Sequence, residues 1–260
     1  YMAVDLEGIS GVCVFDQTRE PTTTHYQDAR RLLMADINAA VEGCFEGGAT
    51  EIVVEDEHAG GFNFVAELID PRVVYLTGKS RPKMSQRESI YTGFDGAILL
   101  GYHSMAGTSD GILNHTQSSL RGNRYWYNGR ESGEIAQAAL RLGHCGVPVV
   151  MVSSDDAGCR EAREFLGEDI VTVSVKRGVT IEYGFLIPPK RAHEMLQEGA
   201  CKAMRLIGKR EPFKMDLPIQ GCLRFPDKST ADAYRPVRGK RVDDHTFEAI
   251  FDRGIDVLEF

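Results

Sequence analysis

Four short apolar runs in the first part of the chain end abruptly in acidic or imidazole side chains. Residues 2–4 run into Asp5 and Glu7, residues 52–54 into the segment that ends at His58, residues 97–100 into His103, and residues 149–152 into Asp155 and Asp156. Short apolar runs bounded by turn residues are typical of buried strands. In open α/β sheets, sites form at the carboxyl ends of the strands, so this pattern predicts a site there.

The segments between these strands show the spacing of amphipathic helices. Apolar residues recur at helical intervals over residues 26–45, and Thr24 is placed to cap that helix. Residues 156–166 show the same spacing, and Ser132 is placed to cap a further helix that runs to Leu142. Strands that alternate with helices favour right-handed crossovers and a parallel sheet.

The pattern changes after about residue 167. We expect a β-branched strand at 170–176, a helix at 189–207, and alternating strands at 219–225 and 246–251. The chain is therefore expected to be α/β, with a mostly parallel sheet flanked by helices over residues 1–167. A smaller α+β C-terminal domain is expected over residues 168–260.

The composition argues against nucleic acids and membranes as binding partners. The 260 residues carry a formal net charge of -8, which argues against nucleic acid because phosphate binding needs a basic surface. No apolar run approaches the roughly 18 residues of a membrane-spanning helix. Six scattered cysteines without a C-x-x-C pair favour free thiols in a reducing cytosol. We therefore expect a cytoplasmic protein with no membrane or nucleic-acid partner.

Asp5 and Glu7 are the first candidate metal ligands. Residues i and i+2 of an extended chain point to the same face, and adjacent carboxylates repel each other unless a cation or a shared proton compensates them. His58 and His103 follow two of the other apolar runs, so they are expected at the same edge of the sheet. The alternatives are a capping acid beside a surface acid, and histidines that are satisfied polar residues.

The neighbouring polar residues have competing interpretations. Asp56 and Glu57 either compete with His58 as ligands or orient its imidazole. His115, in a long polar loop, is either a general acid or base or a loop histidine. Glu134 lies in the first turn of a predicted helix, where the helix dipole alone favours a carboxylate.

The ligand types indicate which metal and which reaction to expect. Mixed carboxylate and imidazole ligands suit zinc, with manganese and iron as rivals. Two metals that share an aspartate lie about 3.5–4 Å apart, lower the pKa of a bridging water and polarise a carbonyl oxygen. Such chemistry hydrolyses amides or phosphate esters. The amide is favoured because the chain lacks a phosphate-binding G-x-x-x-x-G-K-[ST] loop.

Six short segments match the motifs of one enzyme family in order and nearly in spacing. They are V-D-L-E-G-I-S-G at 4–11, D-E-H at 56–58, L-L-G-Y-H at 99–103, G-I-L-N-H at 111–115, N-G-R-E-S-G-E at 128–134 and M-V-S-S-D-D at 151–156. Together they resemble the DppA-type D-aminopeptidases, a family of binuclear zinc enzymes. The resemblance covers roughly residues 1–165 and weakens toward the end of the chain.

The resemblance implies a role for each of these residues. It implies that His115 is the catalytic residue and that Asp5 bridges two zinc ions, whose remaining ligands are Glu7, His58, His103 and Glu134. It also implies an enzyme that releases N-terminal D-amino acids, such as D-Ala, from short peptides through a metal-bound hydroxide. The implied assembly is a homodecamer, in which residues 1–167 form the catalytic domain and residues 168–260 contribute to oligomerisation and line a channel.

Asp155 and Asp156 are candidates for binding the free α-amine of the substrate, because they end a buried strand where the site needs negative charge. Two other functions are alternatives: a dinuclear metal hydrolase for another amide or an ester, and a non-catalytic assembly module with a structural metal. A structural metal has its coordination closed by protein ligands. Five ligands for two metals leave open positions, which favours the enzyme.

Overall fold

The computed structural model describes the backbone of residues 1–260 and every side chain except that of Ser85. Sheet A has seven strands in the order β3-β2-β1-β4-β7-β8-β9. They are β1 (Met2–Val4), β2 (Val53–Asp56), β3 (Val74–Leu76), β4 (Ala97–Leu100), β7 (Val149–Asp155), β8 (Val171–Thr180) and β9 (Tyr183–Leu186). All neighbours pair in parallel except β8 and β9, which confirms the expected sheet.

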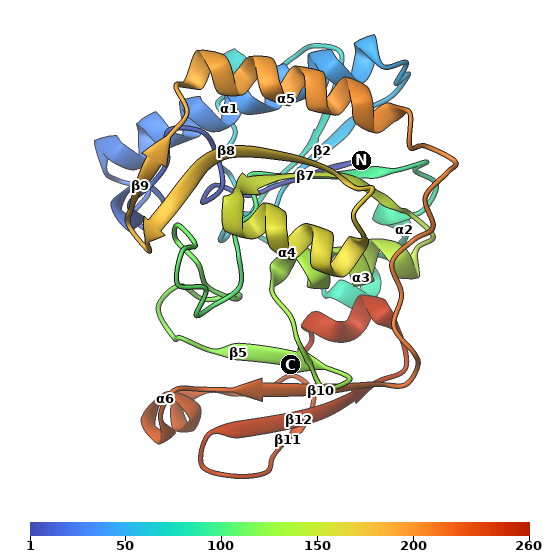
Figure 1. Cartoon of the computed structure of the whole chain (residues 1–260). Helices are drawn as coiled ribbons and strands as arrows, with labels where there is room; N and C mark the ends of the chain where they lie inside the picture. Colours follow the sequence, from blue (N-terminus) through green and yellow to red (C-terminus); the bar gives the residue numbers. More distant parts are fainter.

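Helices cover both faces of sheet A (Figure 1). α1 (Thr24–Glu46) and α5 (Pro189–Met204) pack together on one face, and α3 (Glu134–His144) and α4 (Asp156–Leu166) lie on the other. Strands β1 and β4 are buried along their whole length because both faces of the sheet are covered. The connections contain α2 (Glu88–Tyr91) and 3-10 turns at Phe15–Gln17, Ala66–Leu68, Met84–Gln86 and Gly254–Leu258.

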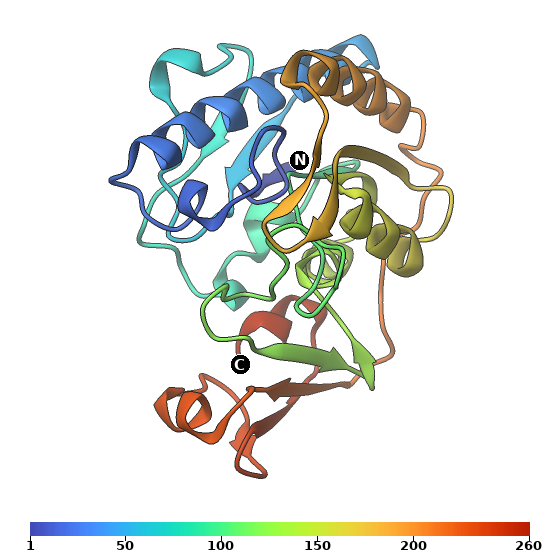
Figure 2. The ribbon, with the colours of Figure 1, turned by 60° about the vertical axis from the view of Figure 1, so that its left-hand side comes forward.

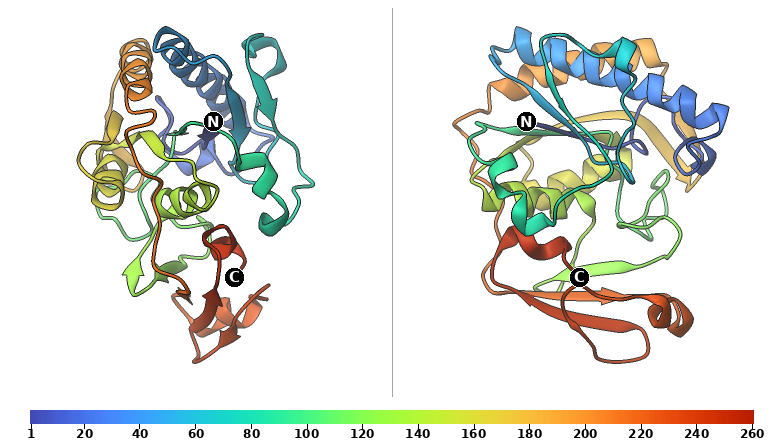
Figure 3. Two further views of the ribbon diagram at one scale, coloured as in Figure 1. Left: turned by 90° about the vertical axis from the view of Figure 1, so that its right-hand side faces the viewer. Right: turned by 180° about the vertical axis from the view of Figure 1, so that it is seen from behind.

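A second sheet lies at the end of the molecule away from α1 and α5 (Figures 2 and 3). This sheet B is antiparallel, in the order β11-β12-β10-β5-β6. Its elements are β5 (Arg124–Tyr127), β6 (Arg130–Glu131), β10 (Ile219–Arg224), β11 (Lys240–Arg241), β12 (Thr246–Phe251) and the adjoining α6 (Lys228–Ala233). Asn128 and Gly129 join β5 to β6 with φ of 50° and 78°, the left-handed pair that the predicted Asn-Gly hairpin turn requires.

The two sheets do not correspond to the segments before and after residue 167. Beyond that residue, β8, β9 and α5 complete sheet A and its helical cover, whereas β5 and β6, well before it, belong to sheet B. The turn at Gly254–Leu258 packs on α3. Each layer therefore draws on both halves of the sequence, and the division into domains 1–167 and 168–260 stays a prediction.

Two helix caps differ from the expected ones. The hydroxyl of Thr23, rather than that of Thr24, accepts a hydrogen bond from the amide of Tyr26 at 3.2 Å and caps α1. Helix α3 begins at Glu134, and Ser132 lies outside it without capping it. This boundary places the carboxylate of Glu134 on the first residue of the helix.

Two further observations concern the helices and the cysteines. None of the described helices combines the length and the apolar character needed to cross a membrane. The six cysteines are free, as their scattered spacing predicts.

Candidate metal centre

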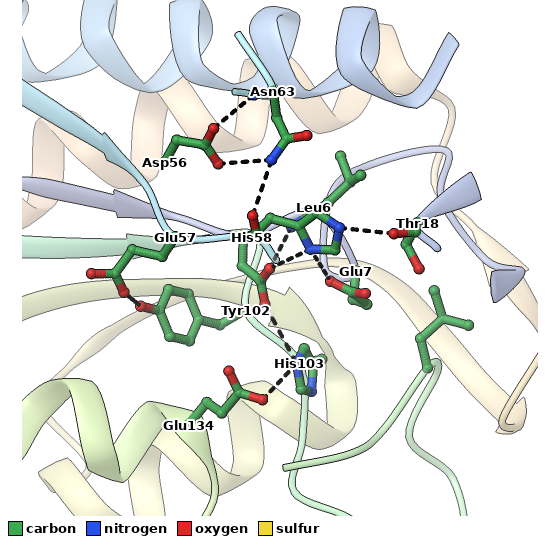
Figure 4. A network of polar contacts seen from close by, with 12 residues as sticks. Leu6, Glu7, Thr18, Asp56, Glu57, His58, Asn63, Tyr102, His103 and Glu134 are labelled. Carbon is green, nitrogen blue, oxygen red and sulfur yellow. Dashed lines mark hydrogen bonds and ion pairs between the residues drawn. The ribbon is translucent and has the colours of Figure 1, made fainter. Parts of the chain in front are cut away.

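The candidate ligands converge at the carboxyl edge of sheet A. Strand β1 lies between β2 and β4, and it pairs in parallel with both. Asp5 follows β1, so it lies between the segment after β2, which carries His58, and the segment after β4, which carries His103. This strand order explains why Asp5 contacts both imidazoles, which lie on opposite sides of the site in Figure 4.

The two carboxylate oxygens of Asp5 face different histidines. Its Oδ1 is 3.0 Å from Nδ1 of His58, and its Oδ2 is 3.4 Å from Nε2 of His103. Oε2 of Glu7 lies 3.0 Å from the same nitrogen of His58, and Oε1 of Glu134 lies 3.4 Å from the same nitrogen of His103. A carboxylate with one oxygen directed at each of two ligand groups has the arrangement of a bridging ligand.

The ligand atoms fall into two groups. Within each group they all lie within 4.8 Å of one another, and the groups are Asp5, Glu7 and His58, and His103, His115 and Glu134. The five predicted metal ligands and the predicted catalytic histidine are therefore brought together from positions up to 129 residues apart in the chain.

Each of the three histidines directs one ring nitrogen into the site and the other onto a backbone carbonyl. The contacts are His58 Nε2 to Thr18 O at 2.8 Å, His103 Nδ1 to Ser104 O at 3.0 Å, and His115 Nδ1 to Leu113 O at 2.8 Å. A carbonyl only accepts, so the nitrogen that faces it carries the hydrogen and donates. The inward nitrogen is then available to a metal, as in metal sites where a second partner fixes the imidazole.

The surroundings of Nε2 of His103, the ring nitrogen that faces the site, show whether these residues fit a metal. This Nε2 is buried and forms no hydrogen bond with a described residue, although carboxylate oxygens of Asp5 and Glu134 each lie 3.4 Å away. Burying a polar atom without a partner is costly, and a cation held between the nitrogen and the oxygens would satisfy all of them. The residues therefore fit a divalent metal, and the mixed nitrogen and oxygen donors suit zinc.

The site also concentrates negative charge that positive charge must balance. Burial by itself raises the pKa of Asp5, but the imidazoles of His103 and His58 hold that pKa well below its usual value. Burial by itself lowers the pKa of His58, but Glu7 and Asp5 raise it well above its usual value. A proton and a metal ion would therefore compete for Nδ1 of His58, and binding of the metal would release the proton.

His115 differs from the other two histidines. Its ring stacks on that of His103, with the centroids 4.0 Å apart, and its Nε2 is 3.7 Å from Oε1 of Glu134. Burial and the charge of His103 lower the pKa of His115, so its ring is neutral near pH 7. A neutral ring whose Nδ1 donates to a carbonyl presents Nε2 to the site as a proton acceptor.

Glu134 is both a carboxylate at a helix start and a candidate metal ligand. It is the first residue of α3, where the helix dipole stabilises a carboxylate. Its Oε1 accepts a hydrogen bond from the amide of Gln117 at 2.7 Å and also faces His103 and His115. The helix terminus therefore stabilises the charge of a carboxylate that is directed at the candidate metals.

Asp56 and Glu57 lie beside the centre rather than within its ligand groups. Asp56 accepts hydrogen bonds from the backbone amide of Asn63 at 2.7 Å and from its side-chain amide at 3.0 Å. The same side-chain amide also donates to the carbonyl of His58 at 3.1 Å (Figure 4). Asp56 thus holds the loop that follows His58, while Glu57 points away toward Tyr102.

Asp155 and Asp156 lie outside both ligand groups. Asp155 is buried, and its oxygens accept hydrogen bonds from the amide of Gly158 at 2.8 Å and from the amide of Ile112 at 2.6 Å. It therefore caps α4 and holds the loop that carries His115. Asp156 is exposed and accepts a hydrogen bond from a neighbouring serine hydroxyl. A role for these carboxylates in binding the substrate amine stays a prediction.

Lys176 supports the centre in a way that the sequence pattern did not reveal. Its buried ammonium lies 2.5, 3.0 and 2.5 Å from the carbonyl oxygens of Glu7, Ile9 and Val12. Three N–H donors thus hold the loop that carries Glu7. Burial lowers the pKa of Lys176 to about 8, so most of the charge is retained at pH 7. In the sequence, the feature that indicates this role is a lysine within an apolar strand rich in β-branched residues.

We expect Lys176→Met to weaken metal binding and to lower the free energy of unfolding. Methionine keeps an unbranched chain but leaves buried carbonyls without their donor, at a cost of about 1–3 kcal/mol for each unsatisfied group. Urea unfolding measures the stability, and competition with a chelator measures the metal affinity. Lys190→Met, at an exposed position near the start of α5, is the control and should change neither quantity. Wild-type values for Lys176→Met would contradict this role.

Comparisons with known proteins agree with the resemblance inferred from the motifs. A family model for D-aminopeptidases, peptidase M55, matches residues 1–260. The curated D-aminopeptidase of Bacillus subtilis (strain 168) is 32% identical over 214 residues, which are 82% of this chain and 76% of that protein. A solved structure also matches, that of the zinc-dependent D-aminopeptidase DppA from Bacillus subtilis, which is described as a self-compartmentalizing protease. The TM-score is 0.88 and the sequence identity is 25%, and the match covers 99% of this chain and 93% of that one. The chain therefore belongs to the peptidase M55 family of D-aminopeptidases.

Proposed function

We propose that the protein is a zinc-dependent aminopeptidase that releases N-terminal D-amino acids from short peptides. The observation that carries the proposal is the position of Asp5 between two ligand groups, in a member of a D-aminopeptidase family. The residues proposed to hold two zinc ions are Asp5, Glu7, His58, His103 and Glu134. The preference for D-Ala and the cytoplasmic location stay predictions.

His115 is proposed to move the proton in this reaction. When bound, a pair of divalent metals polarises a carbonyl and lowers the pKa of water. Nε2 of His115 accepts a proton from the attacking water and delivers it to the leaving nitrogen. Stabilisation of an oxyanion would instead need a hydrogen on Nε2 from the start, whereas the contact with Leu113 favours the hydrogen on Nδ1.

The metal content tests the shared carboxylate. We expect about two zinc ions per chain in protein purified without chelator, measured by plasma mass spectrometry. Asp5→Ala should lose both ions because Asp5 faces both groups, whereas Glu7→Ala and Glu134→Ala should each lose mainly one. Glu168→Ala, at an exposed carboxylate outside the centre, is the control. Retention of both ions in Asp5→Ala would contradict the bridging role.

Turnover tests the reaction and its stereochemistry. We expect release of D-Ala from D-Ala-D-Ala with a much higher kcat/KM than release of L-Ala from L-Ala-L-Ala. His115→Ala should keep its zinc and lose about 100-fold or more in kcat, because a positioned proton carrier contributes 10²–10⁴-fold. Faster turnover of an ester or of another amide would favour the alternative dinuclear hydrolase. A zinc-loaded protein without turnover on any of these substrates would favour the non-catalytic assembly module.

Self-association is proposed to occur through the β8–β9 hairpin. β9 is an outer strand of sheet A, and the hairpin exposes apolar side chains to between 41% and 70%, namely Val179, Ile181, Tyr183, Phe185 and Leu186. An apolar sheet edge is a surface on which another chain can pair. The description of the Bacillus subtilis enzyme as self-compartmentalizing supports a homo-oligomer here, and a decamer stays a prediction.

The same hairpin contacts the loop that carries His115. The amide of Leu113 donates to the carbonyl of Ile181 at 2.7 Å, and the amide of Phe15 donates to Glu182 at 2.7 Å. A second copy seated on this edge would therefore hold the loop of His115 as well as cover apolar surface.

Introducing charge on the hairpin surface tests the assembly. The double variant Tyr183→Glu, Phe185→Glu should sediment as a smaller species than the wild type, because association would bury unpaired carboxylates in an apolar contact. Val74→Glu, at an exposed position on the opposite edge strand β3, is the matched control and should leave the mass unchanged. Analytical ultracentrifugation gives the masses, and a wild-type mass for the double variant would contradict the proposed surface.

A further inference from the structure

A cleft of about 370 Å³ opens directly on the metal centre. Two of its lining residues are the candidate ligands Asp5 and Glu134. Its remaining walls come from the segments after β2, before α2, between β4 and β5, and between α6 and β11, and from α3 and the C-terminal turn. A larger cavity of about 720 Å³ lies on sheet B, but its lining includes none of the candidate ligands. The smaller cleft is therefore the path along which a substrate at the metal centre would extend.

Acidic and basic side chains line this cleft together, and its four carboxylates are those of Asp5, Glu57, Glu134 and Glu259. Four basic side chains also line it, and two of them are neutralised by carboxylates, one half-buried and one buried. Arg141 lies 2.6 Å from Glu57, and Arg87 pairs with Glu55. The other two basic residues of the lining are Arg81 and Lys83.

Neither Arg81 nor Lys83 is neutralised by a carboxylate among the described side chains. The half-buried guanidinium of Arg81 donates to the backbone carbonyls of Asp56 and Glu57, which orients it without cancelling its charge. The side chain of Lys83 is exposed. Two positive charges therefore line the cleft without an ion pair to a described carboxylate, and they are available to bind an anion.

The position of Arg81 is fixed relative to the metal centre by the sheet. Glu57 continues β2, and its amide donates to the carbonyl of Val4, the residue before Asp5, at 2.9 Å. Because neighbouring strands lie about 4.8 Å apart, a guanidinium seated on the carbonyls of Asp56 and Glu57 is about one strand away from Asp5. A peptide spans at most about 3.3–3.6 Å per residue, so two or three residues bridge such a separation.

Local packing holds Arg81 in this place. Gly61 has φ of 77°, and a Cβ built there would lie 3.0 Å from a terminal nitrogen of Arg81 and 2.6 Å from the carbonyl of Gly78. A side chain at residue 61 would therefore clash with the backbone of Gly78 and crowd the guanidinium, so glycine suits this position.

We propose that Arg81 and Lys83 bind the C-terminal carboxylate of a dipeptide or tripeptide whose N-terminal residue lies at the metal centre. Charge-assisted hydrogen bonds from arginine and lysine are the usual means of binding a carboxylate. The inference rests on the proposed peptidase function and adds to it the recognition of the far end of the substrate. It makes a free C-terminus and a short chain requirements for efficient turnover.

A comparison of free and amidated substrates tests the inference. With zinc-loaded wild-type enzyme, kcat/KM for D-Ala-D-Ala should exceed that for D-Ala-D-Ala-amide by about 10- to 100-fold, since a charge-assisted hydrogen bond contributes on the order of 1.5–3 kcal/mol. Lys83→Met and Arg81→Met should each lose about tenfold on the free acid, mainly through KM, and less than twofold on the amide. Lys79→Met, which removes a charge from the same segment outside the cleft lining, is the matched control.

The outcomes separate this inference from the function on which it rests. Equal kcat/KM of the wild type on the acid and the amide, or equal losses of the variants on both substrates, would overturn the carboxylate site while leaving the peptidase intact. Absence of wild-type turnover on both substrates would overturn the proposed function and this inference with it. Zinc content and thermal midpoint are measured on each variant, so that a loss confined to the free acid in a folded, zinc-loaded variant supports the site.

Discussion

Asp5 lies buried between His58 and His103, with one carboxylate oxygen directed at each imidazole. Buried charges of this kind persist only when they are paired, and the pairing here brings together the ends of three neighbouring strands. Because β1 is flanked by β2 and β4, a residue at the end of β1 is the one that reaches both sides. The strand order of the sheet and the contacts of Asp5 with both imidazoles are thus two aspects of one constraint.

Much of the surrounding structure serves to hold the loops that carry these side chains. Backbone carbonyls fix the three imidazole rings, so their orientation depends on the path of the loops rather than on further side chains. Those loops are in turn held by buried charged groups. Lys176, from β8, donates to the carbonyls of Glu7, Ile9 and Val12, and Asp155, at the end of β7, accepts from the amide of Ile112. Strands far from Asp5 in the sequence therefore contribute directly to its surroundings.

The sequence predicts the parts of this arrangement that depend on local pattern. Apolar runs that end in Asp5, His58 and His103 predict strand ends at one edge, and the structure brings those residues together. The Asn-Gly turn after β5 likewise has one favoured geometry. The roles proposed for Glu134 and His115 rest on the resemblance to the family, because a carboxylate at a helix start and a histidine in a loop each have ordinary structural explanations.

Features that depend on long-range pairing could not be predicted in the same way. The pattern shows that 124–127 is a strand but not that it pairs with β10, almost 100 residues later, to form sheet B. A lysine within an apolar strand gives no indication of which carbonyls it will meet. The caps of α1 and α3 each lie one residue from the expected position, because several adjacent residues were able to cap and packing decides among them.

The central claim is that Asp5 is shared by two metal ions. The most direct measurement is a crystal structure of the protein grown with zinc, with anomalous scattering recorded at the zinc edge. The account predicts two anomalous peaks about 3.5–4 Å apart, one beside each oxygen of Asp5 at about 2.0–2.2 Å. A single peak enclosed by four protein ligands, or two peaks that do not contact Asp5, would contradict it.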